Sequence, residues 1–197
     1  MQEEKSRRTQ AERRTETRAA LLDAARQLIV DKGYAETATP EIVKQAAVTR
    51  GALYHHYKDK ADLMRALVHQ ESRAVAEEID ADTDTGQSPL DAFMAGAKAY
   101  FSAMSHPGRA RILLLEGPAV LGVEEMAAID RETGGATILE GLRHAADHGA
   151  LRGVPLEPLA DLLSSAFDRA ALAIANGEDR KAYEDATSLL LEGMLKV

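Results

Sequence analysis

Apolar residues recur three and four positions apart through most of this chain, and that spacing constrains the fold more than any other feature. The first stripe comprises Leu21, Leu22, Ala25, Leu28 and Ile29, as in a helix that buries one face. No segment alternates between apolar and polar residues like a half-buried strand, and aromatic residues make up only 4% of the sequence. This composition favours helices over strands, so we predict an all-α protein of about nine helices.

The first third of the chain contains the capping signals of short helices. Gly33 suits a left-handed C-cap that ends the first helix. Thr39, which precedes a proline, is expected to be the N-cap of a second helix of about two turns. After a tight connection, Thr49 is the N-cap candidate of a third helix from about Arg50 to His56, and Asp59 is expected to cap a fourth helix.

The rest of the sequence predicts longer helices. A polar, turn-rich segment from Asp80 to Pro89 separates them from the front helices. The expected elements are a helix opened by Ser88-Pro89, a short helix containing RILLL between Pro107 and Gly117-Pro118, a long helical stretch from about Val123 to His148 that bends at Gly134-Gly135, and two helices over 156–176 and 178–196.

Charge is distributed unevenly along the chain. Residues 1–60 hold 12 Lys and Arg against 9 Asp and Glu, whereas residues 61–197 hold 12 against 23, within a total net charge of -8. A basic head on an acidic body suggests that the head alone binds a polyanion. The chain has no cysteine, no apolar run near the ~20 residues of a membrane span and a charged N-terminal stretch unlike a signal peptide. We therefore expect a cytoplasmic protein without disulfides that does not enter a membrane.

The segment VTRGALYHHYKDK, residues 48–60, carries side chains that suit DNA binding. Two short helices joined by a tight turn form a helix-turn-helix, here Thr39 to Tyr57. Near its second helix, Arg50 can donate two hydrogen bonds to guanine, and Gly51 lets the backbone approach the groove closely. Further groups that can contact phosphates are at Thr49, Tyr54, His55, His56 and Lys60, whereas Leu53 and Tyr57 should pack inward.

This part of the chain resembles the DNA-binding domain of TetR-type transcriptional regulators. The matching residues are LLDAARQLIVDKGYAETATPEIVKQAAVTRGALYHHYKDKADL, residues 21–63, and the signature within them is I-x-x-x-A-x-V-T-R-G-x-L-Y-x-H-[FY]-x-x-K. The resemblance implies base and phosphate contacts at Thr39, Thr49, Arg50, Gly51, Ala52, Tyr54, His55, His56 and Lys60. It also implies that the remaining helices form the variable regulatory domain of that family.

One residue departs from the family pattern. The family usually has glycine in the turn of the helix-turn-helix, where this sequence has Ala47. If the position needs a positive φ, alanine costs about 1 kcal/mol. Alternatively, the turn adopts another geometry.

Two features of the later helices indicate a dimer and a ligand cavity. Small and apolar residues form stripes that allow two copies to pack as a four-helix bundle, at Leu159, Leu162, Leu163, Ala166 and Ala170 on one helix and Ala182, Ala186, Leu189, Leu190 and Met194 on the other. Large apolar residues in the preceding helices exceed what the dimer helices need and predict a cavity. Its candidate ligand-binding residues are Phe93, Tyr100, Met104, Arg109, His144 and Phe167.

The expected organisation is a flexible tail over residues 1–14, a DNA-binding domain over 15–60 with the helix-turn-helix at about 38–57, and an effector-binding and dimerisation domain over 61–197. We predict a ligand-responsive transcriptional regulator and favour a repressor. It binds a palindromic double-stranded DNA operator as a homodimer and is released by a small organic effector. We expect no catalytic residues, no metal and no cofactor.

Other interpretations stay open at this point. Glu140, His144 and His148 share one helical face by i, i+4 spacing and can hold a metal, which would suit a metal-binding protein or an enzyme built on a helical bundle. No sequence motif of a nucleophile, a P-loop, a dinucleotide site or a zinc protease accompanies them. The chain could also bind protein partners, or regulate transcription without a small ligand. The basic N-terminal residues are either solvated or an arm for the minor groove; they are Lys5, Arg7, Arg8, Arg13, Arg14 and Arg18.

Overall fold

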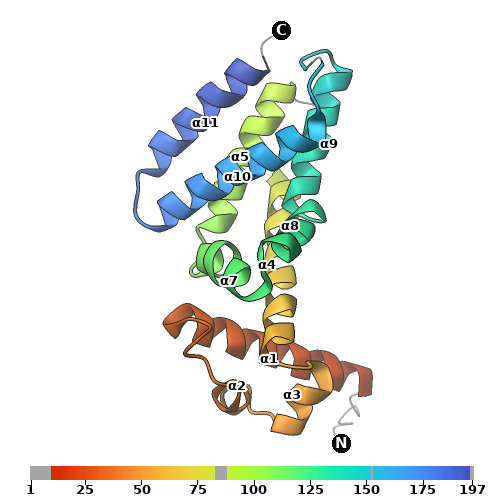
Figure 1. Ribbon diagram of the computed structural model, residues 1–197, viewed down its shortest axis with the longest axis vertical. Coiled ribbons are helices and arrows are strands. Elements are labelled where there is room, and N and C mark those ends of the chain that lie inside the picture. The colour runs from red at the N-terminus through yellow and green to blue at the C-terminus, as the bar shows by residue number, and fades with distance from the viewer. Residues whose placement is uncertain (1–9, 83–87, 152, 196–197) are drawn as a thin grey trace, which may run out of the picture. The chain divides into compact units, whose positions relative to one another are not determined.

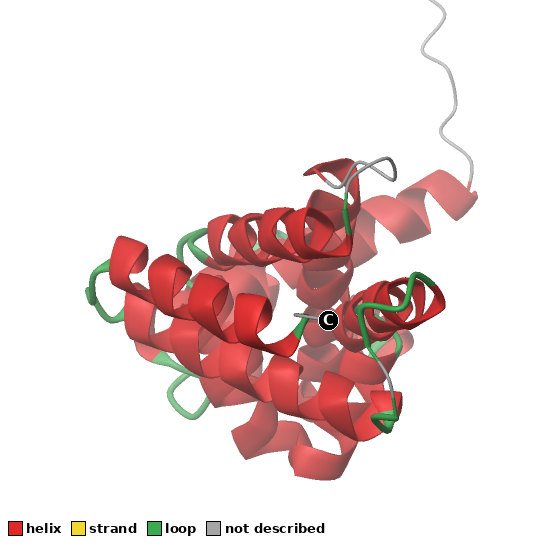
Figure 2. Ribbon diagram, turned by 90° about the horizontal axis from the view of Figure 1, so that it is seen from above, coloured by secondary structure: helices red, strands yellow, loops and turns green. Residues whose placement is uncertain are grey.

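The computed structural model describes residues 10–82, 88–151 and 153–195. Of the expected arm, Lys5, Arg7 and Arg8 lie outside the described part, whereas Arg13, Arg14 and Arg18 belong to the first helix, Gln10–Lys32. All regular elements in that part are helices, which confirms the all-α prediction (Figures 1 and 2). The chain divides into two compact units, residues 1–67 and 68–197. Each unit is described by itself.

The first unit, called the head below, contains three helices and the beginning of a fourth. These are α1 (Gln10–Lys32), α2 (Thr39–Gln45), α3 (Arg50–His56) and the first turns of α4 (Lys60–Asp82) (Figure 1). The helix α1 begins at Gln10, inside the stretch expected to be a tail. The head continues to Leu67 rather than ending at residue 60, because Leu63, Met64 and Leu67 of α4 are buried with it.

The core of the head is built from the apolar stripe that the sequence indicated. Leu21 and Ala25 of α1 are fully buried, and so are Ile42 of α2 and Leu53 of α3. Tyr57, directly after α3, is 3% exposed, which confirms that Leu53 and Tyr57 point inward. Removing these side chains from water at ~25 cal/mol per Å² is what holds the short helices in place.

Most of the expected caps are present. Gly33 has a φ of 88° and ends α1. The hydroxyl of Thr49 accepts a hydrogen bond of 3.1 Å from the amide of Ala52 and so caps α3. Asp59 accepts a hydrogen bond of 2.8 Å from the amide of Asp62 at the start of α4. These three side-chain or backbone features fix where the helices of the head begin and end.

The expected N-cap of α2 was wrong by one residue. Ala38 is the N-cap, and Thr39 is already helical. The carboxylate of Glu41, three residues after Ala38, reaches back to the Ala38 amide at 2.9 Å and also binds Lys32 at 2.7 Å. This half of a capping box satisfies a free amide without a hydroxyl at the N-cap.

The second unit consists of the rest of α4 and all later helices. They are α5 (Pro89–Met104), α6 (Arg109–Arg111), the π-helical segment η1 (Ile112–Glu116), α7 (Gly117–Leu121), α8 (Val123–Arg131), α9 (Gly134–Asp147), α10 (Leu156–Ala175) and α11 (Arg180–Met194). The helix α10 packs against both α9 and α5, and α11 packs against α5 (Figure 1). The side chains of Phe101, Ile112, Leu142 and Leu191 are buried at the centre of these contacts.

Two expected boundaries in the second unit differ from the structure. The sequence predicted that Gly117-Pro118 ends a short helix, but the chain stays helical through both residues. Pro118 lies in the first turn of α7, directly after the π-helical segment, where a residue without an N–H is tolerated. The long stretch from Val123 to His148 is two helices, because the chain leaves helical geometry at Thr133, whose φ is -131° and ψ is -106°.

Gly134 and Gly135, where the sequence predicted a bend within one long helix, instead form the first turn of α9. A side chain at Gly135 would place its Cβ 2.9 Å from an oxygen of Asp130. Glycine is required there because the carboxylate of Asp130 lies against the backbone at the beginning of the helix. None of the described helices is both long enough and apolar enough to cross a membrane.

Ala47 has a φ of 53°, so the turn between α2 and α3 does place alanine in the left-handed region. We expect Ala47→Gly to raise the free energy of unfolding by about 0.5–1 kcal/mol, because the left-handed penalty of an L residue exceeds the entropy that glycine adds to the unfolded chain. Urea denaturation followed by circular dichroism measures the change. Ala46→Gly is the matched control. Because Ala46 has a φ of -73°, glycine at that position should lower the stability of the protein. If both variants lose stability equally, the turn is not strained.

Candidate functional site

The exposed side of α3 is the candidate nucleic-acid surface. Thr49, Arg50, Gly51, Tyr54 and His55 are all exposed on it. Of the other residues in the expected contact set, Ala52, His56, Thr39 and Lys60 are partly buried. The structure therefore brings the central five residues of the motif to one solvent-facing surface, on a helix whose opposite side is fixed by the core.

Arg50 extends along the surface of α3. Its guanidinium carbon lies 5.5 Å from the centre of the Tyr54 ring, within the range of a cation–π contact. Tyr54 is 44% exposed and restricts the conformations of the arginine without taking up its N–H groups. A partly ordered guanidinium with free donors is suited to two parallel hydrogen bonds with a base edge.

Gly51 has no structural role that requires glycine. A Cβ at this position would lie 3.8 Å from the Thr49 hydroxyl, which is ordinary contact, and its φ is not positive. Glycine lowers helix stability by up to about 1 kcal/mol relative to alanine. The head keeps a residue that weakens its own helix, which is explained if another molecule approaches the backbone closely there.

The two histidines differ in environment. Their ring centres are 5.3 Å apart with an edge-to-face arrangement. Partial burial lowers the pKa of His56, and the neighbouring His55, Arg14 and Arg18 lower it further. His56 is therefore neutral at physiological pH, where it offers one N–H rather than a full positive charge.

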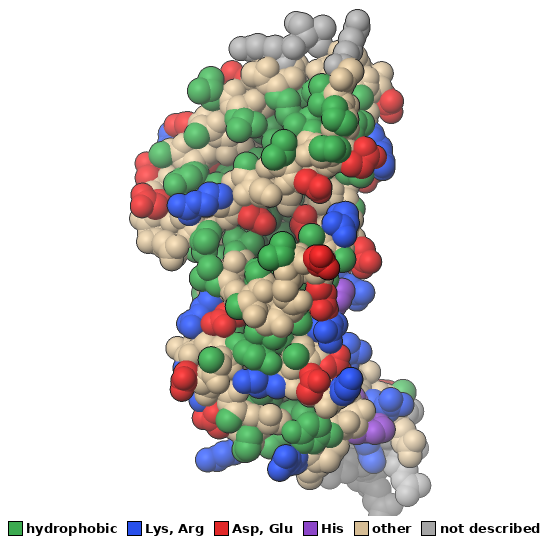
Figure 3. All heavy atoms as spheres, in the orientation of Figure 1, with side chains coloured by type: hydrophobic (Ala, Val, Ile, Leu, Met, Phe, Trp, Pro, Cys, Tyr) green, Lys and Arg blue, Asp and Glu red, His purple; other side chains and the backbone are tan. Residues whose placement is uncertain are grey.

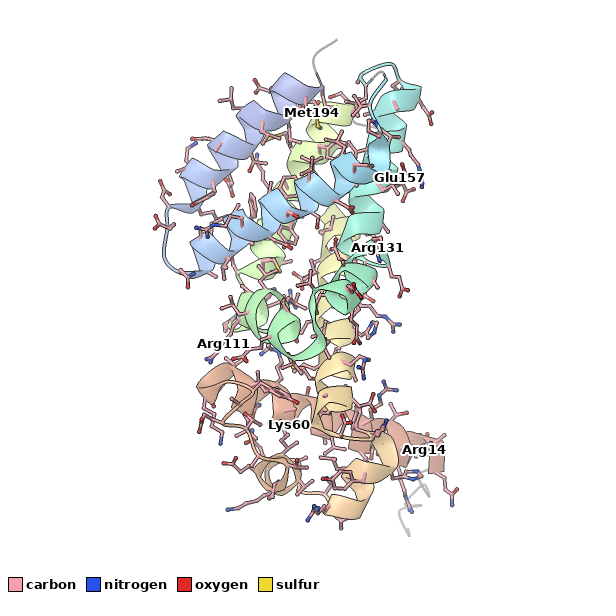
Figure 4. The ribbon with its side chains drawn as sticks, in the orientation of Figure 1. Arg14, Lys60, Arg111, Arg131, Glu157 and Met194 are labelled. Carbon is pink, nitrogen blue, oxygen red and sulfur yellow. The ribbon has the colours of Figure 1, made fainter. Side chains whose placement is uncertain are left out.

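Lys60 holds the head together as well as belonging to the expected contact set. Its ammonium donates hydrogen bonds of 2.9 Å to the carbonyl of Tyr34 and 3.0 Å to that of Thr37, and it lies 4.0 Å from the centre of the Tyr34 ring. It stands at the first residue of α4 (Figure 4). Two of its three N–H groups are thus used inside the head, which ties the loop after α1 to the beginning of α4.

The second unit contains a cavity of about 480 Å³, called the effector cavity below. Four of the six expected ligand-binding residues line it: Phe93, Tyr100, His144 and Phe167. Met104 lines an adjacent cavity of about 620 Å³, to which Tyr100 also contributes. Both volumes lie within the ~300–1,000 Å³ that is usual for small-molecule sites.

Arg109 does not belong to either of these cavities, so its proposed role as a ligand anchor needs correction. Its guanidinium is buried and donates to Glu71 at 3.0 Å, to Glu78 at 2.8 Å and to the carbonyl of Ala103 at 2.8 Å. These acceptors take up the N–H groups of its Nε and Nη1. Sequence reasoning placed it with the ligand because it could not show that two glutamates of α4 face it.

Three polar residues of the effector cavity were missed in the sequence. The Tyr100 hydroxyl donates a hydrogen bond of 2.5 Å to Asp168, and the Ser164 hydroxyl donates one of 2.9 Å to Asp130. Ser164 and Asp168 are four residues apart on α10, beside the buried Phe167. Polar residues at helical spacing next to a core aromatic are the sequence signal that would have pointed to Ser164 and Asp168.

The carboxyl group of Asp168 has an unusual acidity. Burial raises its pKa to about 6; the hydrogen bond from Tyr100 opposes this shift, and the nearby Asp130 adds to it. Burial also raises the pKa of Asp130, and burial together with the charge of Asp168 raises that of Tyr100 well above its ordinary value. Tyr100 therefore remains a hydrogen-bond donor, and two carboxyl groups share a poorly solvated environment.

The possible metal ligands on α9 do not form a metal site. The rings of His144 and His148 are 4.1 Å apart, and Nδ1 of His148 lies 2.8 Å from the His144 carbonyl, to which it donates. Within residues 10–82, 88–151 and 153–195, no three His, Cys, Asp or Glu side chains are placed to hold a metal ion. The geometry gives no support to the metal-binding interpretation.

Comparison with known proteins agrees with this architecture. Residues 21–67 match the family model described as bacterial regulatory proteins of the tetR family. Residues 90–196, more than half of the chain, match the tetracyclin repressor-like C-terminal domain. The chain belongs to the TetR family of transcriptional regulators.

Solved structures of the TetR family match most of the length of this chain. A TetR-family transcriptional regulator from Pectobacterium atrosepticum is 34% identical, and the match covers 95% of this chain and 98% of that one with a TM-score of 0.75. A putative regulator of the family from Shewanella is 24% identical over 92% of this chain and 98% of that one, with a TM-score of 0.76, and shows the fold alone.

Curated relatives match over shorter lengths. The A-factor receptor protein of Streptomyces griseus is 31% identical over 50% of this chain and 34% of that protein. The Transposon Tn10 TetC protein of Escherichia coli is 31% identical over 59% of this chain and 58% of that protein. The chain thus spans about a third to three fifths of the length of these two relatives.

The raised pKa of Asp168 predicts a pH-dependent stability. A folded-state pKa above the ordinary 3.8 means that the folded protein binds more protons, so stability falls as pH rises from about 4 to about 6. At pH 7.5 we expect Asp168→Asn to stabilise this TetR-family protein by about 1–2 kcal/mol, and by about 1 kcal/mol less at pH 5. Urea denaturation at both pH values measures this difference.

Glu178→Gln is the control for the loss of one negative charge, since Glu178 is exposed between α10 and α11. Its effect should be small at both pH values. A destabilised Asp168→Asn variant at pH 7.5 would contradict the assignment of a buried, unfavourable charge.

Proposed function

We propose that this protein is a transcriptional repressor that binds a palindromic DNA operator as a homodimer and releases it when a small organic molecule occupies the effector cavity. The observation that carries the proposal is the exposed set on α3, in which Arg50 and Gly51 have no other explanation in the head. The cavity in a separate compact unit of the same chain supplies a place for a regulating ligand. A relative with a short match bears such a name: the HTH-type transcriptional repressor BepR of Brucella suis is 44% identical over 62 residues, which are 32% of this chain and 29% of that protein.

In the proposed complex, α3 lies in the major groove. Arg50 reads a guanine, Tyr54 contacts a phosphate or a thymine methyl, and Gly51 allows close approach. Thr39, Thr49, Ala52, His55 and His56 complete the contact surface around these residues. Lys60 has one N–H left for a phosphate, but it acts mainly by holding the loop before α2 in position.

The proposed dimer uses the outer faces of α10 and α11. Leu162 is 69% exposed, Leu189 73% and Leu190 49%, and apolar side chains are visible on this face in Figure 3. Leu163 and Ala170, which belong to the expected stripe, are instead buried in their own subunit. The remaining large apolar side chains in contact with water are what a second copy would cover.

The proposed coupling runs through α4. This helix is continuous from Lys60 to Asp82, and it contributes Leu63 and Leu67 to the core of the head. Near its other end, Ile79 and Asp80 line the effector cavity. A ligand that contacts this end of α4 and favours the DNA-incompetent conformation by about 1.4 kcal/mol weakens operator binding tenfold, and DNA weakens the ligand by the same factor.

Arg50→Ala tests the role of α3 in DNA recognition. We expect the variant to lose about 1–3 kcal/mol of binding free energy per half-site for operator DNA, while its affinity for random DNA changes little. Lys44→Ala is the matched control. Lys44 is an exposed basic residue of α2, and its loss should weaken binding to all DNA sequences alike. Fluorescence anisotropy over a series of salt concentrations gives both affinities and the slope, about -0.9 per neutralised phosphate. Unchanged discrimination by Arg50→Ala would exclude base reading by this residue.

Leu162→Glu tests the dimer. A charge buried at the proposed interface costs about 3 kcal/mol or more per subunit, so the variant should sediment as a monomer at micromolar concentration and lose operator affinity while keeping its helical content. Val123→Glu is the control, since Val123 is 77% exposed on α8 and outside the proposed interface. A wild-type protein with a monomeric mass would refute the dimer directly.

A further inference from the structure

We propose that the effector cavity selects a lipophilic cation, a small organic molecule in which an amine or quaternary nitrogen is attached to an aromatic or aliphatic body. This inference rests on the proposed function of the cavity as the effector site, and it names the chemical class of the effector. It follows from three properties of the cavity: the sign of its charged groups, the unbalanced charge at its inner wall, and its aromatic sides.

All formally charged residues that line the effector cavity are acidic. They are Asp80, Asp130, Glu140 and Asp168, and the described lining contains neither lysine nor arginine. Asp80 and Glu140 are exposed, as is His144, whereas Asp130 and Asp168 are partly buried. The acidic residues thus continue from the solvent-facing part of the lining to its inner part, and their combined potential attracts cations and repels anions.

Among the described residues, neither inner carboxylate forms an ion pair; the charge of Arg131 lowers the pKa of Asp130, but burial raises it overall. Asp130 is stabilised by the Ser164 hydroxyl and by the backbone of Gly135. Asp168 accepts a hydrogen bond from Tyr100, and among the described residues it has no ion pair. An ionised carboxylate in this position is costly unless a positive charge approaches it. A ligand with a nitrogen cation beside Asp168 supplies that charge and gains more affinity than the same group would at an exposed carboxylate.

The walls of the cavity suit the rest of such a ligand. Phe93, Tyr100 and Phe167 supply aromatic surface, and the Tyr100 and Phe167 ring centres are 6.4 Å apart. Aromatic faces attract organic cations by about 0.5–2 kcal/mol each when water is excluded. Apolar walls with a few polar anchors also bind the uncharged part of the molecule. Charge and shape therefore favour one class of occupant.

The other charged groups around Asp168 do not change this conclusion. Arg109 of α6 is occupied by Glu71 and Glu78, and Arg180 and Lys181 of α11 pair with Glu184 and Asp185. Arg131 of α8 and Arg169 of α10 are exposed and line the adjacent cavity rather than the effector cavity, as does Asp161. The groups that share the effector cavity with Asp168 are Asp80, Tyr100, Asp130, Glu140 and His144.

Three probes of similar size and different charge test the inference: 4-phenylbutylammonium, 4-phenylbutanol and 4-phenylbutyrate. Isothermal titration at pH 7.5 should rank their affinities in that order, with the ammonium compound favoured over the alcohol by about tenfold, equivalent to about 1.4 kcal/mol. Because the pKa of Asp168 is about 6, this preference should fall several-fold at pH 5, where the carboxyl group is mostly protonated.

Asp168→Asn should remove most of the preference for the ammonium compound at pH 7.5 while leaving the affinity for the alcohol nearly unchanged. Glu178→Gln alters net charge equally outside the cavity and should keep the preference. His144→Gln, measured at pH 5 and 7.5, should keep the pH dependence that is assigned to Asp168. The inference is overturned if the alcohol or carboxylate binds as tightly as the ammonium compound, if Asp168→Asn keeps the preference, or if none of the probes binds at 10 mM.

Operator release, followed in parallel by fluorescence anisotropy, separates this inference from the proposed function. If the ammonium compound binds selectively without weakening DNA binding, the cation site is supported and induction through the cavity is not. If neutral or anionic compounds bind and release DNA, induction is supported and the preference for cations is wrong.

Discussion

The head depends on the burial of a single large side chain in each of two very short helices. The helices α2 and α3 contain seven residues each, well below the ~12–15 at which an isolated helix becomes marginally stable in water. Ile42 and Leu53, both fully buried, supply the packing energy that keeps these helices formed. The exposed residues of α3 can therefore be polar, flexible and even unfavourable for helix formation, because the stability of α3 comes from its opposite side.

The second unit follows a different principle. Most of its helices are longer than those of the head and pack around a shared core. A cavity with partly buried carboxyl groups interrupts that core. Asp168 lowers the stability of the folded protein at neutral pH, since its ionised form is poorly solvated there. A protein keeps such a group when a bound partner restores the lost stability, which couples ligand binding to the conformation of the whole unit.

Sequence reasoning located the features that are encoded locally. The beginning of α3 followed from Thr49, whose cap depends on a residue three positions away. At Ala47 the sequence left two turn geometries open, and the structure has the one with a positive φ. The roles of Arg109 and Asp168 did not follow, because each depends on side chains from other helices that are between 31 and 68 positions distant. The sequence contains no local indication of the π-helical segment before Pro118, and Gly134-Gly135 indicated a bend but not the full break at the preceding Thr133.

The position of Asp130 and Asp168 between two cavities has one more consequence. Both residues, together with Tyr100 and Ser164, line the effector cavity and also the adjacent cavity of about 620 Å³. A positive charge bound on one side of this wall neutralises part of the negative charge that would attract a second cation on the other side. A cation bound in the effector cavity would therefore oppose the binding of a second cation in the adjacent cavity, where Arg131 and Arg169 of the lining already oppose one, and occupancy of one cavity would change which charge its neighbour can hold.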